Sequence, residues 1–369
     1  MHDSSLTKYI PSDRCDLCAL RAAHESSEDV SKYSPQFPKM NPDPLPPNVV
    51  DSLGQPPYVT GESLFLQRIF VELRRELGDR FHEFTFVVHR WKFGERDERP
   101  ISLDPGGPGR ILILICDEKG FFPLQRFPGY EFVFRAYGKP YPRTTWHPFP
   151  IGYFEAAGKE VPISFEHRKN SVFFSGYLNR NRIDLYKQFT RLFWLPRRNL
   201  PGRHLRELAR RIVEKFCRKR NFSDQISGSI IQFTEWFGKG LPPEEYARTL
   251  ADTKIALCPP GFVSHETIRH WEAMRMGCVI ISAPLPAIPF YEGSPIIQLE
   301  DWSELRPLLD RLLADPAELM KRHLAMREWW ENVASEPAIA RYMAGIIRRG
   351  RESSRHSAGT GAQGRADSA

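Results

Sequence analysis

The stretch "CPPGFVSHETIRHWEAMRMGCVIIS", residues 258–282, decides the fold expected of this chain. The apolar run "KIALC" leads into a Pro/Gly turn, and a β-branched strand, "CVIIS", closes the stretch. The residues between them predict a helix over 265–276, with Ser264 as its N-cap and Gly277 as its left-handed stop. Strand, turn, helix and strand in this order indicate one unit of a parallel α/β sheet.

Two stripes run along the predicted helix at about 100° per residue. One is apolar and is expected in the core (Ile268, Trp271, Met274). The other carries His265, Arg269 and Glu272 at the carboxyl end of a predicted parallel strand, where open α/β sheets bind phosphorylated ligands. This pattern predicts phosphate binding by Arg269 and backbone amides, and ribose binding by Glu272.

Simpler interpretations of the same residues remain open. Arg269 and Glu272 could form an ion pair on an exposed helix face, which stabilises a helix only slightly. His265 could equally cap or pack rather than contact a phosphate.

Length and composition indicate a globular chain with two domains. The 369 residues are 41% hydrophobic and 26% charged, which are ordinary globular values. No uninterrupted apolar run approaches the roughly 18 residues of a membrane span. The N-terminus lacks a basic segment followed by an apolar one, so a cytoplasmic location is expected.

The formal net charge of +7 favours anionic partners. Much of this charge lies in residues 180–220, where bases alternate with apolar residues, as on a solvated helix face. Nucleic-acid binding is not expected, because no reading motif and no interleaving of bases with exposed aromatic residues is present. The arginine-rich segments leave two interpretations open: a plain solvated surface, which is favoured, and peripheral contact with an anionic membrane.

Six cysteines are spread without the spacing of a disulfide framework, as in proteins of a reducing compartment. Cys15 and Cys18 form a lone CxxC, with His24 nearby. No second ligand pair follows at zinc-site spacing, so unpaired thiols are favoured over a metal site.

The chain is expected to have four parts. Residues 1–57 are rich in Pro and Asn toward their end and predict an extended arm. Residues 58–155 alternate a helix with buried strands and predict an N-terminal α/β domain, and residues 156–350 repeat the pattern as a second one. A turn-rich linker, 147–170, separates them. The small, polar tail 351–369 is expected to be disordered.

The segment "LCPPGFVSHETIRHWEAMRMGCVIIS" resembles the donor-binding segment of exostosin-like glycosyltransferases and their bacterial relatives. "PIGYF" followed by "SVFFSGYLNRNR" is similar to the entry into their second domain. The resemblance covers about residues 150–305. It implies a GT-B fold, with two Rossmann-like domains facing a cleft, and a glycosyltransferase of polysaccharide biosynthesis that uses a nucleotide-diphosphate sugar of the UDP or GDP type. It implies no metal and no other cofactor.

Position by position, the resemblance implies Glu272 on the ribose and Arg269 near the diphosphate. It places the turn around Gly261 and Ser264 at the phosphates, and the Gly176 loop over them, with Arg180 or Arg182 closing the site. The turn reads Pro-Pro-Gly where the family often has Pro-Arg-Gly, so one phosphate contact differs.

An inverting transfer needs a base for the acceptor hydroxyl, which belongs to a glycan, a lipid-linked saccharide or a protein. Asp117, after the strand "ILILIC", is the candidate, and it could equally be a turn residue. Two other interpretations remain: a basic protein that binds nucleotide or nucleic acid without catalysis, and an α/β scaffold that keeps the pocket but lacks a base.

Overall fold

A computed structural model describes most of the chain from residue 45 onward. The described residues are 45–51, 63–90, 106–120, 122, 129–137, 145–190, 192, 219–235 and 239–363, with isolated positions between 204 and 217. Side chains are described up to residue 352. Nearly all of the predicted arm 1–57, including Cys15 and Cys18, and about half of the basic segment 180–220 lie outside these residues.

The first sheet is formed by five parallel strands in the order in which they occur in the chain. They are β1 (Val49–Asp51), β2 (Thr85–Arg90), β3 (Gly106–Ile115), β4 (Gly129–Ala136) and β5 (Trp146–Phe149). The central strand β3 is buried on both faces. Ile111 and Ile113 belong to one core cluster and Leu112 and Leu114 to another, which explains why "ILIL" is apolar throughout.

The second sheet also has five parallel strands, but not in chain order. The strands are β6 (Asn170–Tyr177), β7 (Ile230–Thr234), β8 (Thr253–Cys258), β9 (Val279–Ser282) and β10 (Ile297–Gln298). Their order is β10-β9-β8-β6-β7, so β6 lies between β7 and β8. From β6 the chain continues to β7 at one edge of the sheet. It then forms β8, β9 and β10 on the other side of β6. Two parallel sheets with helices confirm the predicted α/β fold with two Rossmann-like halves.

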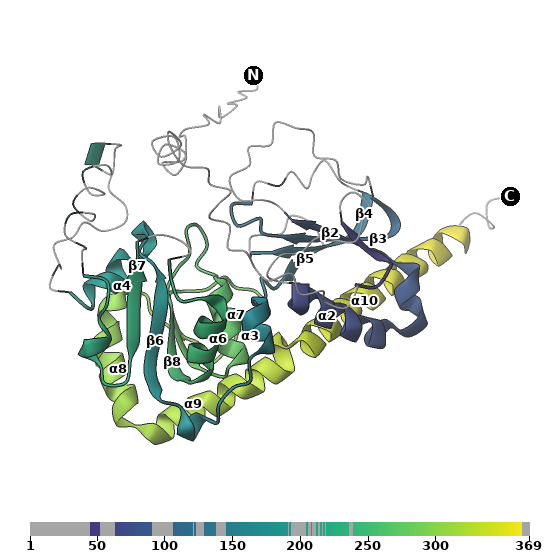
Figure 1. Cartoon of the computed structure of the whole chain (residues 1–369). Coiled ribbons are helices and arrows are strands. Elements are labelled where there is room, and N and C mark those ends of the chain that lie inside the picture. Colours follow the sequence, from purple (N-terminus) through teal and green to yellow (C-terminus); the bar gives the residue numbers. More distant parts are fainter. Residues whose placement is uncertain are drawn as a thin grey trace. The chain divides into compact units, whose positions relative to one another are not determined.

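The helices are α2 (Ser63–Leu77), α3 (Glu155–Lys159), α4 (Ile183–Lys187), α6 (Pro243–Ala251), α7 (Ile268–Arg275), α8 (Leu305–Ala314), α9 (Pro316–Trp329) and α10 (Glu336–Gln363). Gly78 ends α2 with φ of 59°, as the sequence predicts. The longest helix, α10, packs along α2 (Figure 1).

Two expectations about organisation need correction. The predicted linker 147–170 contains most of β5 and the whole of α3. Pro148 is tolerated in β5 because β5 is the edge strand, whose outer side needs no ladder hydrogen bond.

The predicted disordered tail from residue 351 starts inside a helix. α10 passes residue 350 and continues to Gln363. Arg351 anchors this part of the helix, because its Nε lies 2.5 Å from Glu131 Oε1 on β4 and its guanidinium covers the ring of Phe84. The start of the predicted tail, at Arg351, therefore packs against the first sheet.

Among the helices in the described part of the chain, none combines the length and the apolar character needed to cross a bilayer.

Candidate functional site

Helix α7 begins three residues later than its sequence suggests. Thr267, with extended backbone, is the N-cap in place of Ser264, and its N–H donates to Nδ1 of His270 at 3.1 Å. Gly277 ends the helix with φ of 65°, as predicted. His265 consequently lies in the preceding loop, and only Arg269 and Glu272 share the polar stripe on the helix.

The ring of His270 ties the helix to the end of β9. Nδ1 accepts from Thr267, so Nε2 carries the proton and donates to Ser282 Oγ at 2.7 Å. Burial lowers the pKa of His270 to about 4, so the ring is neutral near pH 7 and keeps this pattern. The sequence does not distinguish His270 from a core residue, and its role comes from these contacts.

Residues 259–264, here called the donor loop, connect β8 to the residues before α7. Asn181 holds this loop, because its Nδ2 donates to Gly261 O at 2.6 Å and to Phe262 O at 2.8 Å. Arg182 Nε donates to Pro260 O at 3.0 Å. The loop after β6 therefore fixes the loop after β8, and Asn181 is a site residue that sequence reasoning missed.

Two guanidinium groups converge on Gly176, at the carboxyl end of β6. A Cβ atom at this position would lie 2.5 Å from Arg269 Nη2 and 3.0 Å from Arg182 Nη1. Arg269 Nη2 donates to Ser175 O at 3.0 Å, and Arg182 Nη1 donates to Tyr177 O at 2.8 Å. The absence of a side chain at residue 176 makes room for both arginines, so the structure brings together three residues from distant parts of the sequence.

Arg182 and Arg269 bring two positive charges close together beside Gly176. Burial and the neighbouring Arg269 hold the pKa of Arg182 well below its ordinary value. Among the described residues, both guanidinium groups hydrogen-bond backbone carbonyls, and no carboxylate pairs with either of them. The buried Arg269 Nε and Ser175 Oγ have no hydrogen-bond partner in the described structure. Two cations and two spare hydrogen-bonding groups are suited to an anionic, hydroxyl-bearing ligand.

Glu272 is buried one turn after Arg269, at 4% exposure. Burial raises its pKa to about 7, against the opposing effects of Arg269 and of a hydrogen bond from the N–H of Phe154. A carboxyl group with this pKa can accept hydrogen bonds from two hydroxyl groups when ionised, and it loses a proton near neutral pH.

The remaining predicted donor-site residues differ in their placement. Gly261 and Ser264 lie in the donor loop, closed by a hydrogen bond of 2.8 Å from Gly261 N to Ser264 O. His265 Nδ1 donates to Pro284 O at 2.7 Å, which fits the packing alternative. Arg180 is exposed on the short helix Arg180–Arg182, unlike the buried Arg182 and the half-buried Arg269.

Asp117 follows β3 of the first sheet and does not present a base to solvent. Its side chain is fully buried, and Oδ2 lies 2.6 Å from Nη2 of Arg135 on β4. The N–H of Phe122 also donates to Asp117 Oδ1, at 3.4 Å. These contacts match the alternative that the sequence left open, a residue that fixes the turn after the strand.

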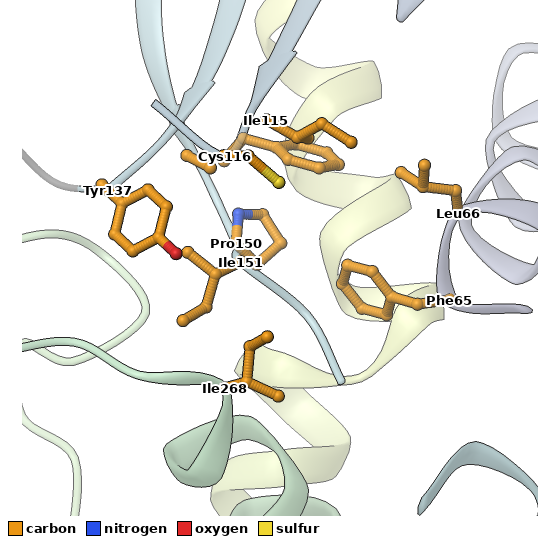
Figure 2. Close-up of a pocket in the computed structure, with 10 residues that line it drawn as sticks. Phe65, Leu66, Ile115, Cys116, Tyr137, Pro150, Ile151 and Ile268 are labelled. Carbon is orange, nitrogen blue, oxygen red and sulfur yellow. The ribbon is translucent and has the colours of Figure 1, made fainter. Parts of the chain in front are cut away.

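A small apolar hollow of about 20 Å³ lies near the ends of β3 and β4 (Figure 2). Cys116 and Tyr137 line it, and both have φ of 64° without being glycine. Ile268, the first residue of α7, lines it as well. Left-handed backbone at two neighbouring strand ends is typical of functional regions, but the hollow has room for about one water molecule and not for a sugar.

Comparison with known proteins supports the class of activity. Residues 202–347 match a family model described as glycosyl transferase-like. The matched segment contains the donor loop, Arg269 and Glu272. No protein of curated function matches the chain significantly.

Several solved structures are similar at low identity. A sucrose-phosphate synthase from Thermosynechococcus elongatus is 13% identical and has a TM-score of 0.38, over 79% of this chain and 80% of that one. A UDP-forming trehalose-phosphate synthase from Burkholderia vietnamiensis is 14% identical, with a TM-score of 0.39, over 77% and 80%. WaaG, a glycosyltransferase involved in lipopolysaccharide biosynthesis, is 12% identical, with a TM-score of 0.36, over 81% and 99%.

Likeness at these TM-scores assigns no substrate. The match of residues 202–347 to a glycosyl transferase-like family model is the finding that bears on function, and it supports the predicted class, a glycosyltransferase.

Proposed function

We propose that this glycosyltransferase takes its sugar from a nucleotide-diphosphate donor, of the UDP or GDP type, and transfers it to a hydroxyl group. The acceptor would be a glycan, a lipid-linked saccharide or a protein. We also propose that the enzyme is exostosin-like and that it acts in polysaccharide biosynthesis. Peripheral attachment to an anionic membrane on the cytoplasmic side would suit a lipid-linked acceptor.

The observation that carries the proposal is the convergence of Arg182 and Arg269 on Gly176. Cleavage of a nucleotide-diphosphate sugar leaves negative charge on the departing diphosphate. The guanidinium groups of the buried Arg182 and the half-buried Arg269, which have only carbonyl partners among the described residues, would stabilise that charge. The arginines supply positive charge from the protein itself, so the proposal requires no metal ion and no other cofactor.

The donor loop and Glu272 would complete the donor site. The N–H groups of Val263 and Ser264 would donate to phosphate oxygens, and the Glu272 carboxylate would accept from the ribose hydroxyl groups. Asn181 would position the loop through Gly261 and Phe262. Inversion at the sugar carbon would need a base other than the buried Asp117, unless that side chain leaves Arg135.

A thermal-shift series tests the donor class. UDP, GDP, ADP, CMP and TDP are added to the wild type, Arg269→Gln, Glu272→Gln and the control Arg248→Gln, which removes one charge from an exposed position on α6. We expect one nucleoside diphosphate to raise the Tm of the wild type and of Arg248→Gln, by mass action on the folded state. The shift should be smaller in Glu272→Gln and lost in Arg269→Gln.

Two results would contradict the proposed donor site. Equal shifts in Arg269→Gln and Arg248→Gln would show that Arg269 does not bind the diphosphate. Stabilisation by oligonucleotide but by no nucleotide would favour a basic binding protein instead.

A further inference from the structure

Glu118 follows β3 in the first sheet and contacts the donor loop of the second. Its Oε1 accepts from Val263 N–H at 3.0 Å and from Ser264 N–H at 2.9 Å. The same oxygen lies 3.2 Å from the position of a Cβ atom on Gly261. One carboxylate oxygen therefore uses two consecutive amides of the loop that the proposed function gives to the donor phosphate.

The preceding residues direct this side chain. Cys116 has left-handed backbone at the end of β3, and Asp117 is fixed beneath the turn by Arg135. Glu118 is half-buried rather than enclosed, so it can move while Asp117 stays in place. In the sequence, Asp117 and Glu118 form the pair "DE" after a buried strand, and only Asp117 was predicted to have a role.

A phosphate oxygen and the Glu118 carboxylate cannot occupy the two amides together. They need the same donors, and their negative charges repel at contact distance. Hydrogen bonds from amides to a charged oxygen are about twice as strong as neutral ones, so loss of the Glu118 contacts is a real cost to any ligand that replaces them.

We propose that Glu118 is an intramolecular competitor of the donor phosphate. Resting on the proposed function, the inference is that donor binding displaces this carboxylate from Val263 and Ser264. Binding of the donor in the second half of the chain is thereby coupled to the release of an acidic side chain from the first half. The competitor weakens donor affinity and keeps the amide pair from binding other small anions.

Calorimetric titration of the full chain tests the competition. The proteins are the wild type, Glu118→Gln, Glu118→Ala and Glu300→Gln, the last an exposed carboxylate that serves as control. Each is titrated with the nucleoside diphosphate found by thermal shift and with the corresponding nucleoside. We expect the diphosphate to bind both Glu118 variants about tenfold more tightly, which is about 1.4 kcal/mol. The nucleoside, which makes no phosphate contact, should bind all four proteins equally.

Each other result overturns the competition. Unchanged or weaker diphosphate binding in both Glu118 variants, with wild-type binding intact, would mean that Glu118 only supports the loop, while the donor assignment stands. Equal tightening of nucleoside and diphosphate would indicate a general change in the pocket. If neither the wild type nor the Glu118 variants bind any nucleotide, the proposed function fails together with this inference.

Discussion

The two sheets of this chain have the same number of parallel strands but differ in strand order. In the first sheet the order follows the chain, from β1 to β5, whereas in the second the chain begins in the middle at β6. The loops after β6 and β8 therefore leave neighbouring strands in opposite directions, at a topological switch point. Open α/β sheets bind ligands at such points, and Arg182, Asn181 and the donor loop meet there.

The arginines near the strand ends also have different partners in the two sheets. In the first sheet the arginine at the strand end, Arg135, is paired with Asp117 at 2.6 Å. In the second, Arg182 and Arg269 hydrogen-bond only carbonyls among the described residues. A paired charge stabilises the turn it holds, whereas cations that hydrogen-bond only carbonyls are suited to bind an anion. We therefore expect the first cluster to contribute stability and the second to bind a ligand.

The largest expected effect is on stability in the first sheet. Asp117→Asn leaves the buried Arg135 without its carboxylate, which should lower the free energy of unfolding by about 3–5 kcal/mol. Urea denaturation measures this loss, and nucleotide affinity below the transition should stay at the wild-type value. A variant with wild-type stability and nucleotide affinity but no turnover would instead make Asp117 the base.

The second effect is the pH dependence of stability contributed by Glu272. Its pKa is about 7 in the folded protein against an ordinary 4.5, so the folded state binds the extra proton between these values. Stability from this group is therefore highest below about pH 4.5 and falls as the pH rises to about 7. At about 1.4 kcal/mol per pKa unit the loss is on the order of 3 kcal/mol.

Unfolding of the wild type and Glu272→Gln at pH 5, 6, 7 and 8 measures this contribution. As the pH rises, the wild type should lose stability relative to Glu272→Gln. A constant difference would show that Glu272 does not titrate in this range.

The smallest expected effect concerns the space at Gly176. Gly176→Ala would bring a methyl group to 2.5 Å from Arg269 Nη2, at the movable end of a side chain. We expect the guanidinium group to shift with little loss of stability and about a tenfold loss of diphosphate affinity. Calorimetry compares it with Gly345→Ala on α10, where a Cβ atom would lie 3.1 Å from Nη1 of Arg349, also the movable end of a side chain. Equal diphosphate affinities of the two variants would show that residue 176 does not affect phosphate binding.

Local patterns predicted the elements of the second half well, because apolar runs and glycine stops are read over short distances. The strands at 253–258 and 279–282 and the stop at Gly277 lie where expected. The helix start was wrong by three residues, since Ser264 and Thr267 both suit an N-cap. The choice was made by His270, whose ring accepts from Thr267 and also reaches Ser282.

The sequence by itself predicted the two parallel α/β halves. Residue type and spacing indicated that Arg269 and Glu272 suit a phosphorylated ligand, and the family resemblance added Gly176 and Arg182. Only the tertiary structure decided which carboxylates serve which purpose. Asp117 and Glu118 are neighbours of the same chemistry, yet one is paired with Arg135 and the other meets the amides of Val263 and Ser264. Their difference arises from contacts with residues 18 and about 145 positions away in the chain, which no local pattern contains.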